Sequence, residues 1–147
     1  MDGIGTGLAI AGAIMTTGKV IKQIKDFITD SKTVDESVKG FLNEVEALQS
    51  VLEAIKNSFA DIGSLADERE SIRKLWSSVD KTIEDCQHSL GKLHLIFRRL
   101  GKQVGNGYQA IVKQLKVKSK TDDIANIRRQ IISYNVTFQT AITSITL

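Results

Sequence analysis

Apolar residues recur every three or four positions along most of the chain, and this spacing predicts long amphipathic helices. The sequence contains no proline, which would interrupt a helix. We expect four long helices, over about residues 4–29, from 33 to about 61–63, from 64–71 to about 100, and from 119–123 towards 147. A short additional helix is expected over 108–116. The pattern therefore predicts an all-α fold, an up-down four-helix bundle that forms a single domain over residues 1–147.

The start of the second helix is marked by a capping box, Thr33-Val34-Asp35-Glu36. Trp76 is expected beside the apolar stripe of the third helix, and the Thr- and Ile-rich end over 137–147 is expected to fray or to favour β structure. The stripes of the last three helices are expected to form the core; they comprise Val38, Phe41, Leu42, Val45, Leu48, Val51, Leu52, Ile55 and Phe59, then Ile72, Leu75, Val79, Ile83, Cys86, Leu90, Leu93, Phe97 and Leu100, then Ile124, Ile127, Ile131, Tyr134, Phe138, Ala141 and Ile145.

Residues 3–18 differ from the other helices because they carry no charge and their small residues recur four apart. One row contains Gly3, Gly7 and Ala11, the next contains Gly5, Ala9, Ala13 and Thr17, and the bulky side chains are Ile4, Leu8, Ile10 and Ile14. In water each interior glycine costs a helix about 0.5–1 kcal/mol relative to alanine. In a membrane the same rows let two helices approach closely. Two interpretations stay open: a glycine-rich helix packed on other helices, and a membrane-inserting helix that self-associates.

The uncharged run is too short for a permanent membrane span, which needs about 20 apolar residues. It also lacks the form of a signal peptide, because Asp2 precedes it and the lysines follow it. We therefore expect conditional membrane insertion. Lys19, Lys22 and Lys25 would then lie at the depth of the lipid headgroups and attract anionic lipid.

Charge is distributed unevenly along the chain, although the net charge is only +3. Residues 31–90 hold 7 basic and 12 acidic side chains, which gives −5, whereas residues 91–147 hold 10 basic and 2 acidic ones, which gives +8. The basic third includes Lys113, Lys116, Lys118 and Lys120. It suggests attraction to phospholipid headgroups or nucleic acid, and a solvated basic surface is the neutral alternative. We expect no nucleic-acid binding, because no recognition motif accompanies the charge.

Residues suited to catalysis or metal binding are not grouped in the sequence. Cys86 lies on the apolar stripe, as a buried structural thiol would. His88 and His94 are six residues apart and do not share a helix face. The stretch 13–20 approaches a phosphate-binding loop but has Ala13 and Val20 at two defining positions. We expect no catalytic, cofactor or metal site and no enzymatic activity.

Several features taken together resemble the fungal HeLo-like (HELL) domain over essentially the whole chain. They are the Met-Asp start, a glycine-zipper first helix that ends in Gly18-Lys19-Val20-Ile21, a long second helix, and Leu75-Trp76 followed by Cys86 and Leu90. Domains of this family stand at the N-terminus of fungal cell-death proteins and NLR-type receptors. They are similar to the four-helix bundle of the mammalian necroptosis effector MLKL.

The resemblance implies an executioner domain of regulated cell death, as in fungal innate immunity and heterokaryon incompatibility. Such a domain rests in the cytoplasm, and on activation by an NLR or amyloid-motif protein it oligomerises and permeabilises the plasma membrane. Residues 1–18 would be the membrane-targeting segment, and anionic membrane lipids the partner. The zipper positions that the resemblance assigns are Gly3, Gly7 and Ala11, with Gly5, Gly12 and Gly18 as associates. The alternative is a soluble helical adaptor that oligomerises or binds a partner helix and has no membrane activity.

Overall fold

The computed structural model describes residues 3–30, 36–62, 70–101 and 123–146, and these residues form four helices. They are α1 (Gly3–Asp30), α2 (Glu36–Ile62), α3 (Glu70–Gly101) and α5 (Asp123–Thr146). The predicted all-α fold with four long helices is confirmed, and apart from the start of α2 each bound agrees with its expected range to within about one residue. The capping residues at 33–35 and the short helix expected over 108–116 lie outside the described residues.

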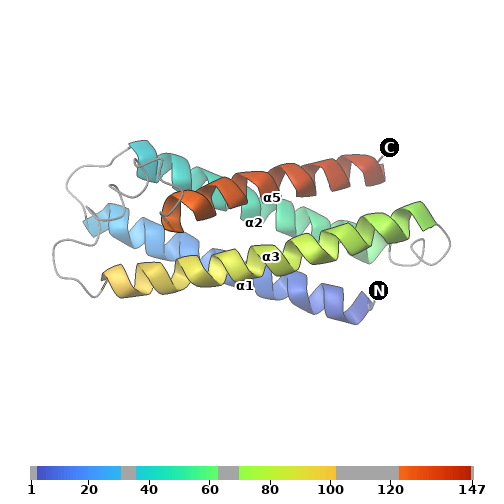
Figure 1. The fold of residues 1–147 in the computed structure, drawn as a ribbon, viewed down its shortest axis with the longest axis horizontal. Coiled ribbons are helices and arrows are strands. Elements are labelled where there is room, and N and C mark those ends of the chain that lie inside the picture. Colours follow the sequence, from blue (N-terminus) through green and yellow to red (C-terminus); the bar gives the residue numbers. More distant parts are fainter. Residues whose placement is uncertain (1–2, 31–35, 63–69, 102–122, 147) are drawn as a thin grey trace.

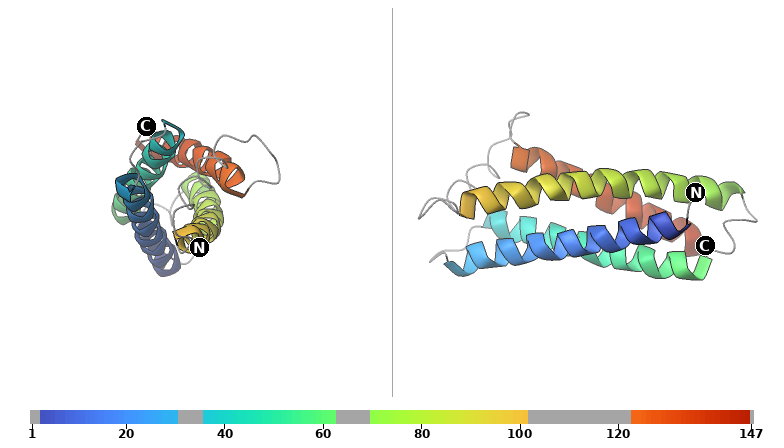
Figure 2. Two further views of the ribbon diagram at one scale, coloured as in Figure 1. Left: turned by 90° about the vertical axis from the view of Figure 1, so that its left-hand side faces the viewer. Right: turned by 90° about the horizontal axis from the view of Figure 1, so that it is seen from below.

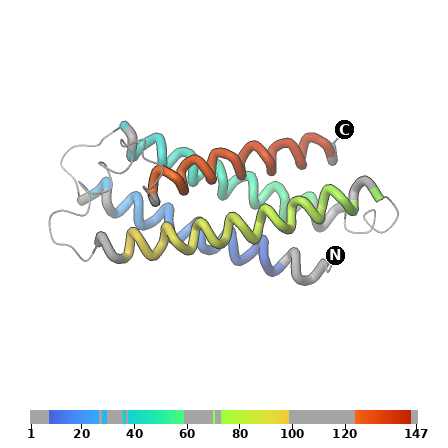
Figure 3. Tube along the Cα trace, in the orientation of Figure 1, coloured from blue at the N-terminus to red at the C-terminus, as the bar shows by residue number. Residues whose placement is uncertain are grey.

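Successive helices run in opposite directions along the bundle, as Figure 1 shows. α1 packs against α2 and α3, and α5 packs against the same two helices. The end-on view of Figure 2 gives the order α1, α2, α5, α3 around the bundle, and Figure 3 traces the same paths. α2 and α3 are consecutive along the sequence but lie diagonally across the described bundle. Because directions alternate along the sequence, the neighbouring helices α1 and α3 run parallel to each other, and so do α2 and α5.

The core contains buried residues from all four helices, among them most of the predicted stripe positions of α2, α3 and α5. Three predicted positions are only partly buried, namely Leu42, Leu75 and Tyr134. Four others lie outside the side chains that the structure describes, namely Phe59, Ile72, Leu100 and Ile145. Trp76 is one correction, because it is completely buried while Leu75 is only partly buried. The buried positions of α3 step by three and four residues through Trp76, Val79 and Ile83, so Trp76 belongs to the central row and Leu75 to its edge. Near one end of the core the rings of Phe41 and Phe97 stack with centroids 6.4 Å apart.

The C-terminal part of α5 is the second correction, because it is helical through Thr146 and neither frays nor turns to β structure. Its β-branched and hydroxyl residues are accommodated by hydrogen bonds to the preceding turn. The Thr140 hydroxyl donates to the carbonyl oxygen of Val136 at 2.8 Å, and the Thr143 hydroxyl donates to that of Gln139 at 2.9 Å. Phe138 and Ala141 are buried in the core and hold this part of the helix in place.

Candidate functional site

α1 carries most of the predicted site residues, and its corner position gives it an inner and an outer side. The inner side buries Ile10, Ala13, Thr17, Val20 and Ile24. Ala13 and Thr17 of the second row of small residues thus point into the bundle. The Thr17 hydroxyl donates a hydrogen bond of 2.6 Å to the carbonyl oxygen of Ala13, which lets a polar side chain sit in the core. In the closed bundle this row serves helix packing, as the first of the two sequence interpretations proposed.

The outer side of α1 presents apolar side chains to solvent, followed by basic ones. Leu8 is 71% exposed and Met15 is 64% exposed. Lys19, Lys22 and Lys25 are exposed along the next turns. Leu8 was grouped with Ile10 and Ile14 on the expected bulky side, but it is turned away from the core that buries Ile10.

The remaining predicted site residues fall into three groups. Gly3, Ile4, Gly5 and Gly7 form the first turns of α1, and their surroundings lie outside the described part of the chain. Ala11, Gly12, Ile14 and Gly18 are partly buried along the flanks of the helix. The third group is the four lysines of the basic third, Lys113, Lys116, Lys118 and Lys120, and it lies outside the described residues.

Gly12 forms a notch that receives a side chain from α3. The side-chain amide of Gln87 donates a hydrogen bond of 3.2 Å to the carbonyl oxygen of Ala9 on α1. A Cβ atom at position 12 would lie 2.4 Å from the Gln87 amide nitrogen, which is far inside van der Waals contact. The absence of a side chain at Gly12 is therefore what allows Gln87 to reach the backbone of α1.

A second amide links α1 and α3 further along the same seam. The Gln23 amide nitrogen donates to the carbonyl oxygen of His94 at 3.3 Å. The Gln23 amide oxygen and His94 Nδ1 are buried and have no hydrogen-bond partner within the described part of the chain. Such atoms lose hydration without compensation, so this part of the seam is less favourable than a fully paired one.

α2 and α5 are joined by a stronger polar contact than either link of α1. Arg128 donates two hydrogen bonds to the Glu44 carboxylate, from Nε at 2.8 Å and from a terminal nitrogen at 3.0 Å. The Asn135 amide adds a 3.2 Å bond to the carbonyl oxygen of Glu44. Gly40 leaves room for the guanidinium, because a Cβ atom there would lie 3.2 Å from it. A bidentate ion pair whose side chains are about three-quarters buried is among the stronger polar contacts in proteins.

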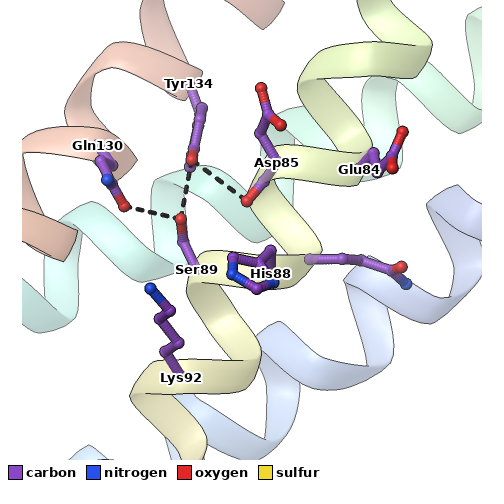
Figure 4. A pocket seen from close by; sticks show the side chains of 8 residues that line it. Glu84, Asp85, His88, Ser89, Lys92, Gln130 and Tyr134 are labelled. Atoms are coloured by element: carbon purple, nitrogen blue, oxygen red, sulfur yellow. Dashed lines mark hydrogen bonds between the residues drawn. The ribbon is translucent and has the colours of Figure 1, made fainter.

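α3 and α5 meet along a polar groove of about 650 Å³, which Figure 4 shows from close by. The hydroxyl of Ser89 is buried at its base, where it donates to Gln130 Oε1 at 2.8 Å and shares a 2.8 Å hydrogen bond with the Tyr134 hydroxyl. The Tyr134 hydroxyl also lies 3.2 Å from the carbonyl oxygen of Asp85, so its single proton can be donated either to Ser89 or to Asp85. These side chains form hydrogen bonds with one another, so we interpret the groove as a polar contact between α3 and α5.

Burial favours the neutral forms of Tyr134 and Cys86. Burial raises the pKa of Tyr134, an effect that the hydrogen bond from Ser89 partly offsets. Burial also raises the pKa of Cys86 from 9.0 to about 12, so its thiol is protonated at neutral pH and a poor nucleophile. No three His, Cys, Asp or Glu side chains within the described ranges are grouped to hold a metal ion.

Sequence reasoning missed the polar residues that join the helices, above all Gln87, Gln23 and the Glu44–Arg128 pair. The available signal was weak: each lies beside an apolar stripe, where a polar side chain can reach a neighbouring helix. Their partners are backbone carbonyls or residues about 70–90 positions away, which a pattern along one helix cannot reveal.

A family model described as "Pigment biosynthesis cluster protein PigL N-terminal" matches residues 1–147. Neither the curated proteins nor the solved structures gave a match. The match to the family model extends over the entire sequence. The chain therefore belongs to the PigL N-terminal domain family.

Proposed function

We propose that this chain is a membrane-permeabilising domain of regulated cell death, in which α1 leaves the bundle, inserts into an anionic membrane and packs against copies of itself. The proposal includes the HeLo-like relationship suggested by the sequence. The family description names a pigment biosynthesis cluster protein and its N-terminal part, and it states no activity.

The observation that carries the proposal is the way α1 is attached. Its described polar links to α3 are two hydrogen bonds from neutral amides to backbone carbonyls, at 3.2 and 3.3 Å. The other three helices are joined through side chains on both partners, by the Glu44–Arg128 ion pair and by the Ser89–Tyr134–Gln130 cluster. α2, α3 and α5 can therefore stay together as a body while α1 departs.

The departure of α1 needs a strong driving force. α1 buries four large apolar side chains in the core, namely Ile10, Val20, Ile21 and Ile24. Exposing each of them to water costs about 1.5–3 kcal/mol, so the free energy needed to release α1 is roughly 6–12 kcal/mol. In water nothing offsets this cost, whereas in a membrane lipid and neighbouring copies of α1 can bury the same side chains again. The closed bundle is accordingly a resting state, and clustering by an activator would raise the local concentration of α1.

The length and the composition of α1 explain why self-association would be required. Its 28 residues make a rod of about 42 Å, longer than the roughly 30 Å hydrocarbon core of a bilayer. Within the described ranges, however, no helix combines the length and the apolar character needed to cross a membrane. Several copies packed along Gly3, Gly7 and Ala11 would shield one another's backbones and hydroxyl groups from lipid.

The test is dye release from vesicles of phosphatidylcholine and phosphatidylserine by the full chain clustered on an oligomeric fusion partner. A variant with Gly12→Cys and Gln87→Cys places two thiols where α1 and α3 touch, so that a short thiol cross-linker can hold α1 in the bundle. We expect release by the clustered wild type and by the reduced variant, and strongly reduced release after cross-linking. The native thiol, Cys86, is completely buried and should not compete.

The matched control is the wild type treated with the same cross-linker, which should still release dye. Unchanged release by the cross-linked variant would show that α1 does not need to leave. No release by any clustered form would instead favour the soluble adaptor. Gly7→Leu, which interrupts the first small row, should also lower release while the bundle remains folded.

A further inference from the structure

We infer that the closed bundle itself docks on an anionic bilayer through the outer side of α1, before α1 leaves the bundle. We define the docking face as Leu8, Met15, Lys19 and Lys22. The inference rests on the proposed function for the choice of a membrane as partner. The inference adds to that proposal a first contact between protein and membrane, which the bundle makes while its core is still closed.

The apolar part of the docking face consists of two side chains that contribute little to the bundle. Leu8 and Met15 are seven residues apart, so they lie on one side of α1 about 10 Å from each other. They are 71% and 64% exposed, the two highest values among the exposed large apolar side chains of the described chain. Both stand on the convex outer surface of the helix, which suits insertion between lipid headgroups.

The basic part of the docking face follows directly along the helix. Lys19 and Lys22 lie four and seven residues after Met15, hence on the same side, and both are exposed. Lys25 is exposed one turn further on, and Asp26 is the acidic residue that continues this side. Two apolar side chains followed by lysines match the interface of an anionic bilayer, where apolar groups enter the acyl boundary and ammonium groups remain among the phosphates.

Docking in this manner leaves the packing of α1 intact. Ile10, Ala13, Val20 and Ile24 point into the core, opposite to the docking face, and stay buried when Leu8 and Met15 enter lipid. The closed bundle can therefore bind the membrane at no cost in core contacts. Insertion would then start from protein already concentrated at the surface.

α5 offers a matched control on the same molecule. Ile132 and Val136 are four residues apart on one side of α5 and are exposed, with the exposed Arg129 one turn before Ile132. This patch also presents two large apolar side chains, which are 44% and 62% exposed, but it lacks the run of lysines that follows Met15. An interaction driven by exposed apolar area alone would use both patches, whereas the inferred docking uses the one on α1.

The experiment is flotation of the full chain, with no clustering partner, on vesicles with and without phosphatidylserine. The Gly12→Cys/Gln87→Cys protein cross-linked between α1 and α3 should bind as tightly as its reduced form. Leu8→Ser/Met15→Ser should weaken the binding about tenfold or more, as should Lys19→Gln/Lys22→Gln. Ile132→Ser/Val136→Ser should change it less than about twofold, and vesicles of phosphatidylcholine alone should bind far less protein. Because the side chains replaced by serine or glutamine are exposed, these variants should retain the helical circular dichroism of the wild type.

Four results would overturn the inference. They are failure of the cross-linked bundle to bind, equal losses for the α1 and α5 variants, equal binding to neutral vesicles, and no binding by any form. The first of these, together with dye release by the clustered wild type, would leave the proposed function standing. Binding by the cross-linked bundle without any dye release from clustered protein would support docking and refute permeabilisation.

Discussion

At the scale of single residues, the small side chains of α1 already have a role inside the resting bundle. Gly12 lets the Gln87 amide reach the carbonyl oxygen of Ala9, and Ala13 and Thr17 lie in the core. The same rows that suggest helix–helix packing in a membrane therefore also shape the closed state. A substitution in them can change the stability of the bundle and the association of released helices at once, so the two effects need separate measurement.

The Gly12–Gln87 contact predicts a non-additive pair of substitutions. Alanine in place of glycine raises helix propensity by about 0.5–1 kcal/mol, but at Gly12 its Cβ would displace Gln87 and break a hydrogen bond worth about 0.5–1.5 kcal/mol. Gly12→Ala should thus be neutral or destabilising in the wild type, and stabilising in a Gln87→Ala background. Urea unfolding of the four proteins in the cycle measures the difference. The same gain in both backgrounds would mean that Gly12 does not hold space for Gln87.

At the scale of helices, the sequence predicted the elements well because each buried stripe follows the 3.6-residue period. That period shows which face of a helix is buried, but not which helix covers it. The diagonal placement of α2 and α3 was therefore not predictable from the stripes. Trp76 was misplaced because a stripe along α3 could be drawn through either of two adjacent positions. Leu8 and Ile10 were grouped together as bulky residues of α1, but the structure exposes Leu8 and buries Ile10, a division that the apolar pattern alone does not reveal.

The Glu44–Arg128 pair predicts how firmly α2 and α5 are held together. Both side chains are about three-quarters buried and make two hydrogen bonds, so their coupling free energy in a double-mutant cycle should be about 1–2 kcal/mol. Arg128→Lys should recover only part of it, because one ammonium cannot reproduce the paired geometry. The Lys39–Glu36 pair, whose side chains are 53% and 90% exposed, serves as the control and should couple by less than about 0.5 kcal/mol. Equal coupling in both pairs would contradict the special role of the α2–α5 contact.

At the scale of the whole molecule, the alternating helix directions bring the start of α1 and the end of α5 to the same end of the bundle (Figure 1). A module attached after residue 147 would therefore sit near the segment that is proposed to insert. Oligomerisation of such a module would gather the first turns of several α1 helices on one side of the assembly. The body of α2, α3 and α5 could remain folded behind them, because the ion pair and the hydroxyl cluster that join these three helices do not involve α1.

This geometry predicts that a trimeric coiled coil fused to the C-terminus will activate the chain. Linking copies raises their effective concentration to about the millimolar range, so the protein concentration needed for half-maximal dye release should fall by about 10²–10⁴-fold relative to the unfused chain. A monomeric fusion partner of similar size should leave it unchanged. Gly7→Leu in the trimeric fusion should reverse most of the gain, because the linked helices would still be close but could not pack. If the trimeric fusion released no more dye than the monomeric one while still binding anionic vesicles, α1 would be a membrane-docking helix and not an inserting one.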